Sequence, residues 1–296
     1  MTLQDMPIMD RLHIGGRIEA PSGKAVVVDR AVFEHLASFK RVRLNDIDRV
    51  ATPPDALWNV RKIFGHLALP FPRLWIEWNN TRDDGGTGLP SLWMAAACES
   101  FKSAEVQPEW CPVELHENSW MVCPLALHGG RVLQIPMALI VELNSDGLFE
   151  GLYGMSVRGD GTTGSTPMDV AAVVDMLWDA LVAVGWMNCR NVEVRHHSRE
   201  GKPSKSKGRR RERSVRSLDF HTIHLPGREA SDGLHDSAGG PGGGARLHQV
   251  RGHFKTFTEA APLMGKHTGT YWWGWQLRGD RRNGSIISDY HISRAS

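Results

Sequence analysis

The feature that most constrains the fold is a series of short apolar runs separated by turn signals between residues 93 and 157. Runs of this kind, with glycine-containing turns between them, are typical of neighbouring antiparallel strands. Turn signals stand at His128-Gly-Gly and at Asn144-Ser-Asp-Gly. We therefore expect an antiparallel meander, with its clearest strands at Trp120–Leu127, Val132–Leu143 and Leu148–Val157.

Helical patterns lie on both sides of this meander. Asp29 is placed to cap a helix whose apolar face ends near Phe39, and a second helix is expected over Pro54–Leu67. A strand is expected at Leu74–Trp78, and a long apolar helix begins at Pro167 and ends at Gly185. Together these elements predict an α+β fold in which antiparallel sheets pack with a few helices.

Charge is unevenly distributed along the chain. Residues 1–198 hold 17 Lys/Arg and 24 Asp/Glu, a net of −7, whereas residues 199–216 hold nine and two, a net of +7. We expect an acidic body over 1–198, a basic flexible linker over 199–217 and a basic β-rich unit over 218–296 that packs on the body. The linker and a glycine-rich insertion at 227–244 have too little apolar surface to form a core, so both are expected to be mobile.

Three strands are expected in the last fifty residues, at Arg246–Phe257, Thr270–Arg278 and Ile286–Ile292, with Asn283-Gly284 in a turn. They predict a C-terminal three-stranded antiparallel unit. Alternation along the first strand puts Arg251, His253 and Lys255 on one face.

These basic side chains form a candidate catalytic site. Arginine and lysine bind phosphate, and a histidine can move a proton near neutral pH. If the protein is an enzyme, we expect a metal-independent nuclease with His253 as acid or base. Its expected partners are Arg251, Lys255, Arg278 and Tyr290. In the alternative interpretation the arginines stack on tryptophans and the histidine hydrogen-bonds to a carbonyl group.

A second candidate site is the basic run itself, which is suited to sequence-independent phosphate contacts. The residues expected to bind nucleic acid there are Lys205, Lys207, Arg209, Arg210, Arg211 and Arg213. The alternative is a solvated loop without a partner. Three tryptophans, Trp272, Trp273 and Trp275, are candidates for base stacking or for the core.

Other classes of site and of location have little support in the sequence. The four cysteines form no C-x-x-C pair and no histidine spacing suits a metal, so no metal or cofactor is expected. A transmembrane helix at Met168–Val184 would bury Asp169, Asp175 and Asp179 in hydrocarbon. With no visible signal peptide, we expect a cytoplasmic protein with no membrane partner.

The C-terminal pattern resembles a group of proteins carried by tailed bacteriophages and prophages. The resemblance rests on Arg251-Gly-His-Phe, Gly269-Thr-Tyr-Trp, Arg278-Gly and Asp289-Tyr290. It implies a viral or mobile-element origin and, if phage-encoded, the cytoplasm of the host cell, but it implies no activity. Our functional expectation is a protein that binds or processes nucleic acid through its basic C-terminal part. The alternative is an accessory protein that binds a host or virion protein without catalysis.

Overall fold

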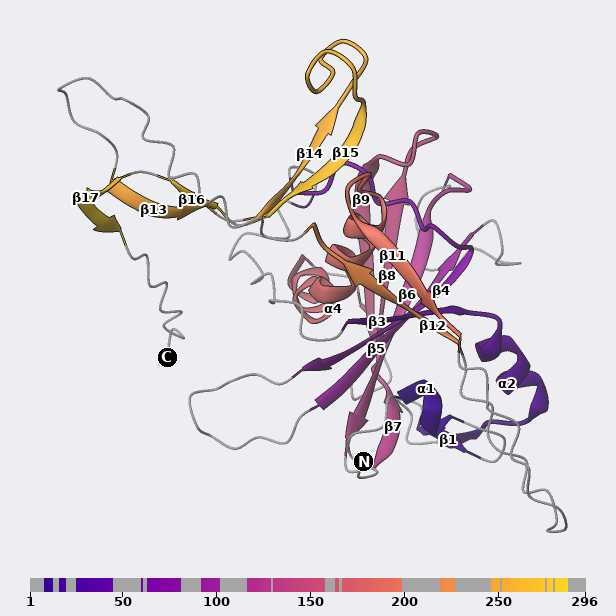
Figure 1. The fold of residues 1–296 in the computed structure, drawn as a ribbon. Helices are drawn as coiled ribbons and strands as arrows, with labels where there is room; N and C mark the ends of the chain where they lie inside the picture. The colour runs from indigo at the N-terminus through magenta and orange to yellow at the C-terminus, as the bar shows by residue number, and fades with distance from the viewer. Residues whose placement is uncertain are drawn as a thin grey trace, which may run out of the picture.

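A 12-stranded sheet dominates the computed structural model, with the strand order β10-β9-β8-β6-β5-β4-β3-β12-β11 (Figure 1). Three further strands branch from this order at β6, which pairs with β7; β7 pairs with β1, and β1 with β2. The structure describes residues 8–12, 16–19, 25–44, 60, 63–80, 92–101, 116–128, 130–157, 163–164, 167–198, 219–226, 246–250, 252–274, 276–278 and 280–286. The strands of this sheet are β1 Arg17–Glu19, β2 Ala25–Val27, β3 Lys40–Leu44, β4 Arg73–Asn80, β5 Leu92–Ser100, β6 Trp120–His128, β7 Arg131–Gln134, β8 Met137–Leu143, β9 Phe149–Val157, β10 Thr163–Gly164, β11 Glu193–His197 and β12 Phe220–His224.

The predicted α+β class with antiparallel sheets is wrong, because the described chain is mostly β and its large sheet is mixed. Strand β3 runs parallel to both of its neighbours, β4 and β12, and β1 runs parallel to β7. The sequence did not indicate β3, since its Lys-Arg-Val-Arg-Leu pattern reads as a polar segment. In the structure Arg41 and Val42 are both buried, on opposite faces of the sheet.

The meander prediction is confirmed for β6, β8 and β9, which are successive antiparallel neighbours. The predicted strand Val132–Leu143 is divided into β7 and β8, and both of these pair with β6. The two turn signals are also confirmed, because Gly130 (φ 78°) and Gly147 (φ 75°) adopt the left-handed backbone that glycine tolerates.

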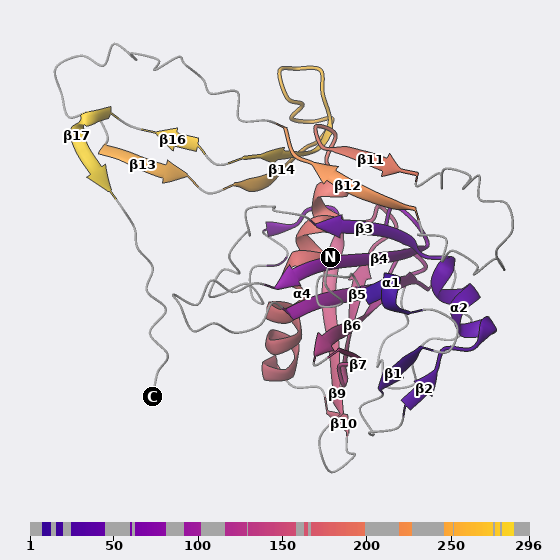
Figure 2. The same ribbon diagram turned by 60° about the horizontal axis from the view of Figure 1, so that its bottom comes forward.

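Helix α4, Pro167–Met187, covers one face of the sheet and builds the larger core (Figure 2). Strand β4 presents Leu74, Ile76 and Trp78 to this core, as expected from the two-residue period of a strand. The helix runs two residues past the predicted end at Gly185, because Gly185 is packed against Phe254 and Phe64 rather than placed in a turn. It is the one helix in the described residues that is long and apolar enough to span a membrane, and its apolar side chains lie in the core.

The opposite face of the sheet carries a smaller core under α1, Ile8–Arg11, and α2, Arg30–Ala37. The predicted cap of α2 is confirmed, because the Asp29 side chain accepts a hydrogen bond of 2.9 Å from the Val32 amide. In the region of the second predicted helix, Val60 and Ile63 are helical, but residues 64–67 are described and are not, so the predicted end of this helix at Leu67 is wrong.

Strands β11 and β12 form the last antiparallel pair of the sheet, so the expected linker at 199–217 joins two neighbouring strands. The expected boundary at 217–218 thus falls between two strands of one sheet. The basic run 199–216 and the insertion 227–244 both lie outside the described residues.

The C-terminal part forms a hairpin and a separate small sheet, and Figures 1 and 2 both show the small sheet away from the large sheet. The hairpin pairs β14, His253–Phe257, with β15, Gly269–Trp273. The small sheet has the order β16-β13-β17, with β13 Arg246–Val250, β16 Gln276–Arg278 and β17 Asp280–Ile286. The predicted three-stranded antiparallel unit is therefore wrong, since β17 runs parallel to β13 and contains Asn283 and Gly284 within the strand.

Candidate nucleic-acid interface on the C-terminal hairpin

One face of the β14–β15 hairpin is fastened to the body of the protein. Phe254 packs between Phe64 and Trp272, with ring centroids 5.3 and 4.8 Å away, and Trp272 contacts Trp186 edge-on at 5.6 Å. Two hydrogen bonds join the Asn191 side chain to the backbone of Trp272, at 2.8 and 2.9 Å. The face of the hairpin that carries Phe254 and Trp272 is thus aromatic and fixed to the body. Because this face is fixed, the position of the opposite face is also defined.

The outward face of the hairpin carries the opposite set of side chains. Because side chains alternate along a strand, His253, Lys255 and Phe257 share this face with Tyr271 and Trp273, and the register puts His253 opposite Trp273. His253 and Lys255 are exposed, and the three aromatic residues are partly exposed. We call these five residues the hairpin face.

A cation lies between aromatic rings at the centre of the hairpin face. The Lys255 Nζ atom is 4.9 Å from the centroid of the Phe257 ring and 5.7 Å from that of Trp273, within the range of cation–π attraction. Tyr271 is directly opposite Lys255 in the register. The arrangement therefore combines a positive charge with ring surfaces, the two features that bind a phosphate backbone and unstacked bases.

Sequence reasoning missed one basic residue beside this face. Arg190 lies on the turn after α4, and its backbone amide donates to the Thr270 carbonyl at 2.9 Å. Its exposed side chain runs along Gly269, since a Cβ built there would be 2.5 Å from the Arg190 Nε atom. Arg190 is 79 positions from Gly269 in the sequence (269 − 190), so only the fold brings it to the Phe257–Gly269 end of the hairpin.

The structure brings together only some of the expected catalytic residues. His253 and Lys255 are two apart on β14, as expected from their alternation. Arg278 lies on β16 opposite His248, five residues before His253, so the register does not place it beside that histidine. Arg251 and Tyr290 lie outside the described residues, as do all six residues expected to bind nucleic acid in the basic run.

The three tryptophans that were candidates for base stacking also differ in their placement. Trp272 is buried in the core, Trp273 is partly exposed on the hairpin face, and Trp275 lies outside the described residues. The core interpretation is therefore confirmed for Trp272, and the stacking interpretation stays a prediction for the partly exposed Trp273.

Four histidines lie on the paired strands β11 and β12. The His196 ring contacts the His221 ring at a tilt, with centroids 4.9 Å apart, and His196 Nε2 lies 3.4 Å from Asp219 Oδ2. His221 Nδ1 lies 3.1 Å from the Arg41 carbonyl oxygen. On the other face, the Thr222 hydroxyl is hydrogen-bonded to the Nε2 atoms of both His197 and His224. No group of three or more metal-ligating side chains occurs in the described part of the chain.

This cluster gives the protein a pH-dependent stability. Burial lowers the pKa of His221 from its ordinary value of 6.5, and the nearby His196, Lys40 and His197 lower it further, against the Arg41 carbonyl, which raises it. The unfolded chain then binds more protons than the folded chain, so stability falls as the pH drops below about 6.5. We expect His221→Gln to have a smaller decrease in melting temperature between pH 7.5 and 5.5 than the unaltered protein. An unchanged decrease would contradict this assignment.

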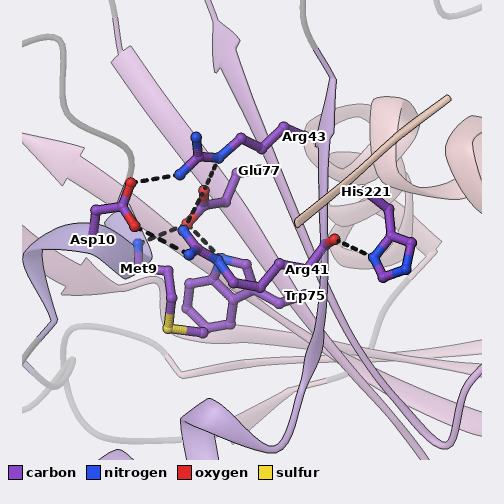
Figure 3. Close-up of polar contacts among 7 residues, drawn as sticks. All are labelled: Met9, Asp10, Arg41, Arg43, Trp75, Glu77 and His221. Atoms are coloured by element: carbon purple, nitrogen blue, oxygen red, sulfur yellow. Dashed lines mark hydrogen bonds and ion pairs between the residues drawn. The ribbon is translucent and has the colours of Figure 1, made fainter. Parts of the chain in front are cut away.

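A second polar cluster lies under α1, with Glu77 and Arg41 buried at its centre (Figure 3). Glu77, fully buried, accepts hydrogen bonds from the Met9 amide at 2.6 Å and from the Trp75 indole at 2.7 Å. Arg41 and Arg43 lie beside it, and Asp10 pairs with both arginines. Two positive and two negative charges balance, so the cluster fastens α1 to the sheet and has no free charge for a ligand.

The cysteines of the described residues offer no reactive thiolate. Burial raises the pKa of Cys123 to about 11 and that of Cys189 to about 12, so both thiols are protonated at neutral pH. The hairpin face thus remains as the exposed cluster of charged and aromatic side chains that has a recognisable binding chemistry. A comparison of this chain with models of protein families, with curated proteins and with solved structures finds no match.

Proposed function

We propose that this protein binds nucleic acid, with the hairpin face as the surface on which unpaired bases stack. The observation that carries the proposal is Lys255 held between Phe257 and Trp273 on an outward face whose reverse side is fastened to the core. A fixed platform loses little conformational freedom when bases stack on it. Every base has a flat apolar surface, so such a platform binds single strands with little sequence preference.

The charge distribution supports the same partner. Arg190 adds a positive side chain at one end of the hairpin, and the run 199–216 adds a net charge of +7 in the sequence. Cations of this kind contact phosphates and give a binding that weakens as salt rises. The resemblance to phage and prophage proteins is compatible with this role in the host cytoplasm.

The proposal concerns binding and not cleavage. Of the cations expected to bind phosphate beside the proton-transferring His253, Lys255 shares its face, Arg278 pairs with His248 in the register, and Arg251 lies outside the described residues. An accessory protein that binds a host or virion protein is the alternative, and it is favoured if the test below finds no affinity for nucleic acid.

The test measures the affinity of the full chain for a 20-nucleotide deoxythymidine strand by fluorescence anisotropy. We expect Trp273→Ala to weaken binding by about 5- to 150-fold, since loss of one stacked base costs about 1–3 kcal/mol. Trp273→Phe keeps a ring and serves as the matched control, with most of the affinity retained. The melting temperatures of both variants show whether the hairpin is still folded. Equal affinity of the alanine variant and the unaltered protein would remove the hairpin face from the mechanism.

A further inference from the structure

The loop between β14 and β15 is an ordered apolar tip that projects from the body (Figure 1). Its residues 260–264 read Ala-Ala-Pro-Leu-Met, without a charged or polar side chain. The turn is closed by two hydrogen bonds between the backbones of Leu263 and His267, at 2.7 and 3.0 Å. The tip therefore presents apolar side chains in a defined conformation.

Both the exposure and the backbone conformation of Met264 at this tip are unfavourable for methionine. Its side chain is 86% exposed, the largest value among the exposed large apolar residues of the described chain. Its backbone has φ 51°, in the left-handed region that non-glycine residues seldom adopt. Glycine or asparagine would suit both the exposure and the backbone better. Residues that are kept in an unfavourable conformation and exposed to solvent are characteristic of recognition sites.

The tip continues directly from the hairpin face. Phe257 and Gly269 are the last residue pair of the hairpin, and residues 258–268 form the loop beyond them. Lys266 and His267 are exposed on the loop just after Met264. A strand that stacks along Trp273, Tyr271 and Phe257 thus reaches the tip at the end of the platform, where Lys266 carries a positive charge and Glu259 a negative one.

We infer that Met264 is a wedge, and that the preferred ligand is a junction between single-stranded and double-stranded nucleic acid. This inference rests on the proposed function. The single strand occupies the hairpin face, and Met264 packs against or between the first base pairs of the duplex. Methionine and other apolar side chains unstack base steps in this manner, and the gain comes from removing the exposed side chain from water. The terminal base pair of a duplex is the easiest to open, so the wedge acts there.

The experiment compares three DNA probes: a deoxythymidine strand, a blunt duplex, and a forked duplex with 2-aminopurine in the first base pair. Met264→Gly removes the wedge and suits the left-handed backbone, so the variant remains folded, with a melting temperature that is unchanged or higher. Met264→Leu is the matched control, because it keeps an apolar side chain of similar size. Affinity, 2-aminopurine fluorescence and melting temperature are measured for each protein.

We expect the unaltered protein to bind the fork at least fivefold more tightly than the single strand and to raise the fluorescence of the probe. Met264→Gly should lose this preference and the fluorescence rise, with its affinity for the single strand within twofold of the unaltered protein. Met264→Leu should retain both. Binding of the single strand without a preference for the fork overturns the wedge and leaves the proposed function intact. Failure to bind any probe overturns both, and points to a protein pocket as the partner of the tip.

Discussion

Replacing Glu77 with alanine should lower the free energy of unfolding by about 3–5 kcal/mol, the cost of removing one partner from a buried ion pair. The variant leaves the Trp75 indole and the Met9 amide without their acceptor, and leaves two arginines to share Asp10. Each unpaired polar group adds a desolvation cost, because Met9 and Trp75 are buried. Denaturant unfolding followed by tryptophan fluorescence measures the change.

Two further variants show whether the burial of Glu77 causes the expected destabilisation. Glu77→Gln keeps an acceptor oxygen and loses the charge, so its destabilisation should lie between that of the alanine variant and zero. Arg30→Ala removes an ion pair with Glu34 whose side chains are 84% and 63% exposed, and its unfolding midpoint should not change measurably. If Glu77→Ala were as stable as Arg30→Ala, the buried cluster would not be what fastens α1 to the sheet.

The second large effect is expected on the affinity for nucleic acid when the basic run 199–216 is altered. Replacing Arg209, Arg210, Arg211 and Arg213 with alanine should weaken single-strand binding by about two to three orders of magnitude near 0.1 M salt. The slope of log affinity against log salt should also decrease by about 3, since each lost phosphate contact contributes about 0.7. This prediction rests on charge alone, because the four residues lie outside the described part of the chain. Anisotropy titrations from 50 to 500 mM salt measure both quantities.

The control for this experiment removes positive charge at another place on the molecule. Arg30 on α2 and Arg131 on β7 are exposed residues of the body, so their double alanine variant should change the affinity and the salt slope little. An equal loss in the control would mean that net charge, and not the run, determines the affinity. An unchanged slope in the fourfold variant would exclude the run from phosphate contacts.

Local patterns predicted those elements whose signals lie within a few residues. Asp29 at the start of α2 and the glycines at 130 and 147 are examples, because a helix cap and a tight turn are determined by neighbouring backbone groups. Alternation also predicted which residues share a face within β14 and β15. The same reasoning failed for β3, since no local pattern shows that Arg41 will be neutralised by Asp10 and Glu77.

By itself, then, the sequence determined the acidic and basic parts of the chain, the meander, the capped helix and the period-two faces of β14 and β15. The tertiary structure alone decided that the sheet is mixed, that Arg190 lies beside Gly269, and that Trp272 is buried while Trp273 is partly exposed. It also placed Arg278 away from His253. The physical reason is that periodicity defines which side chains share a face, whereas burial and charge pairing depend on which distant element packs against that face.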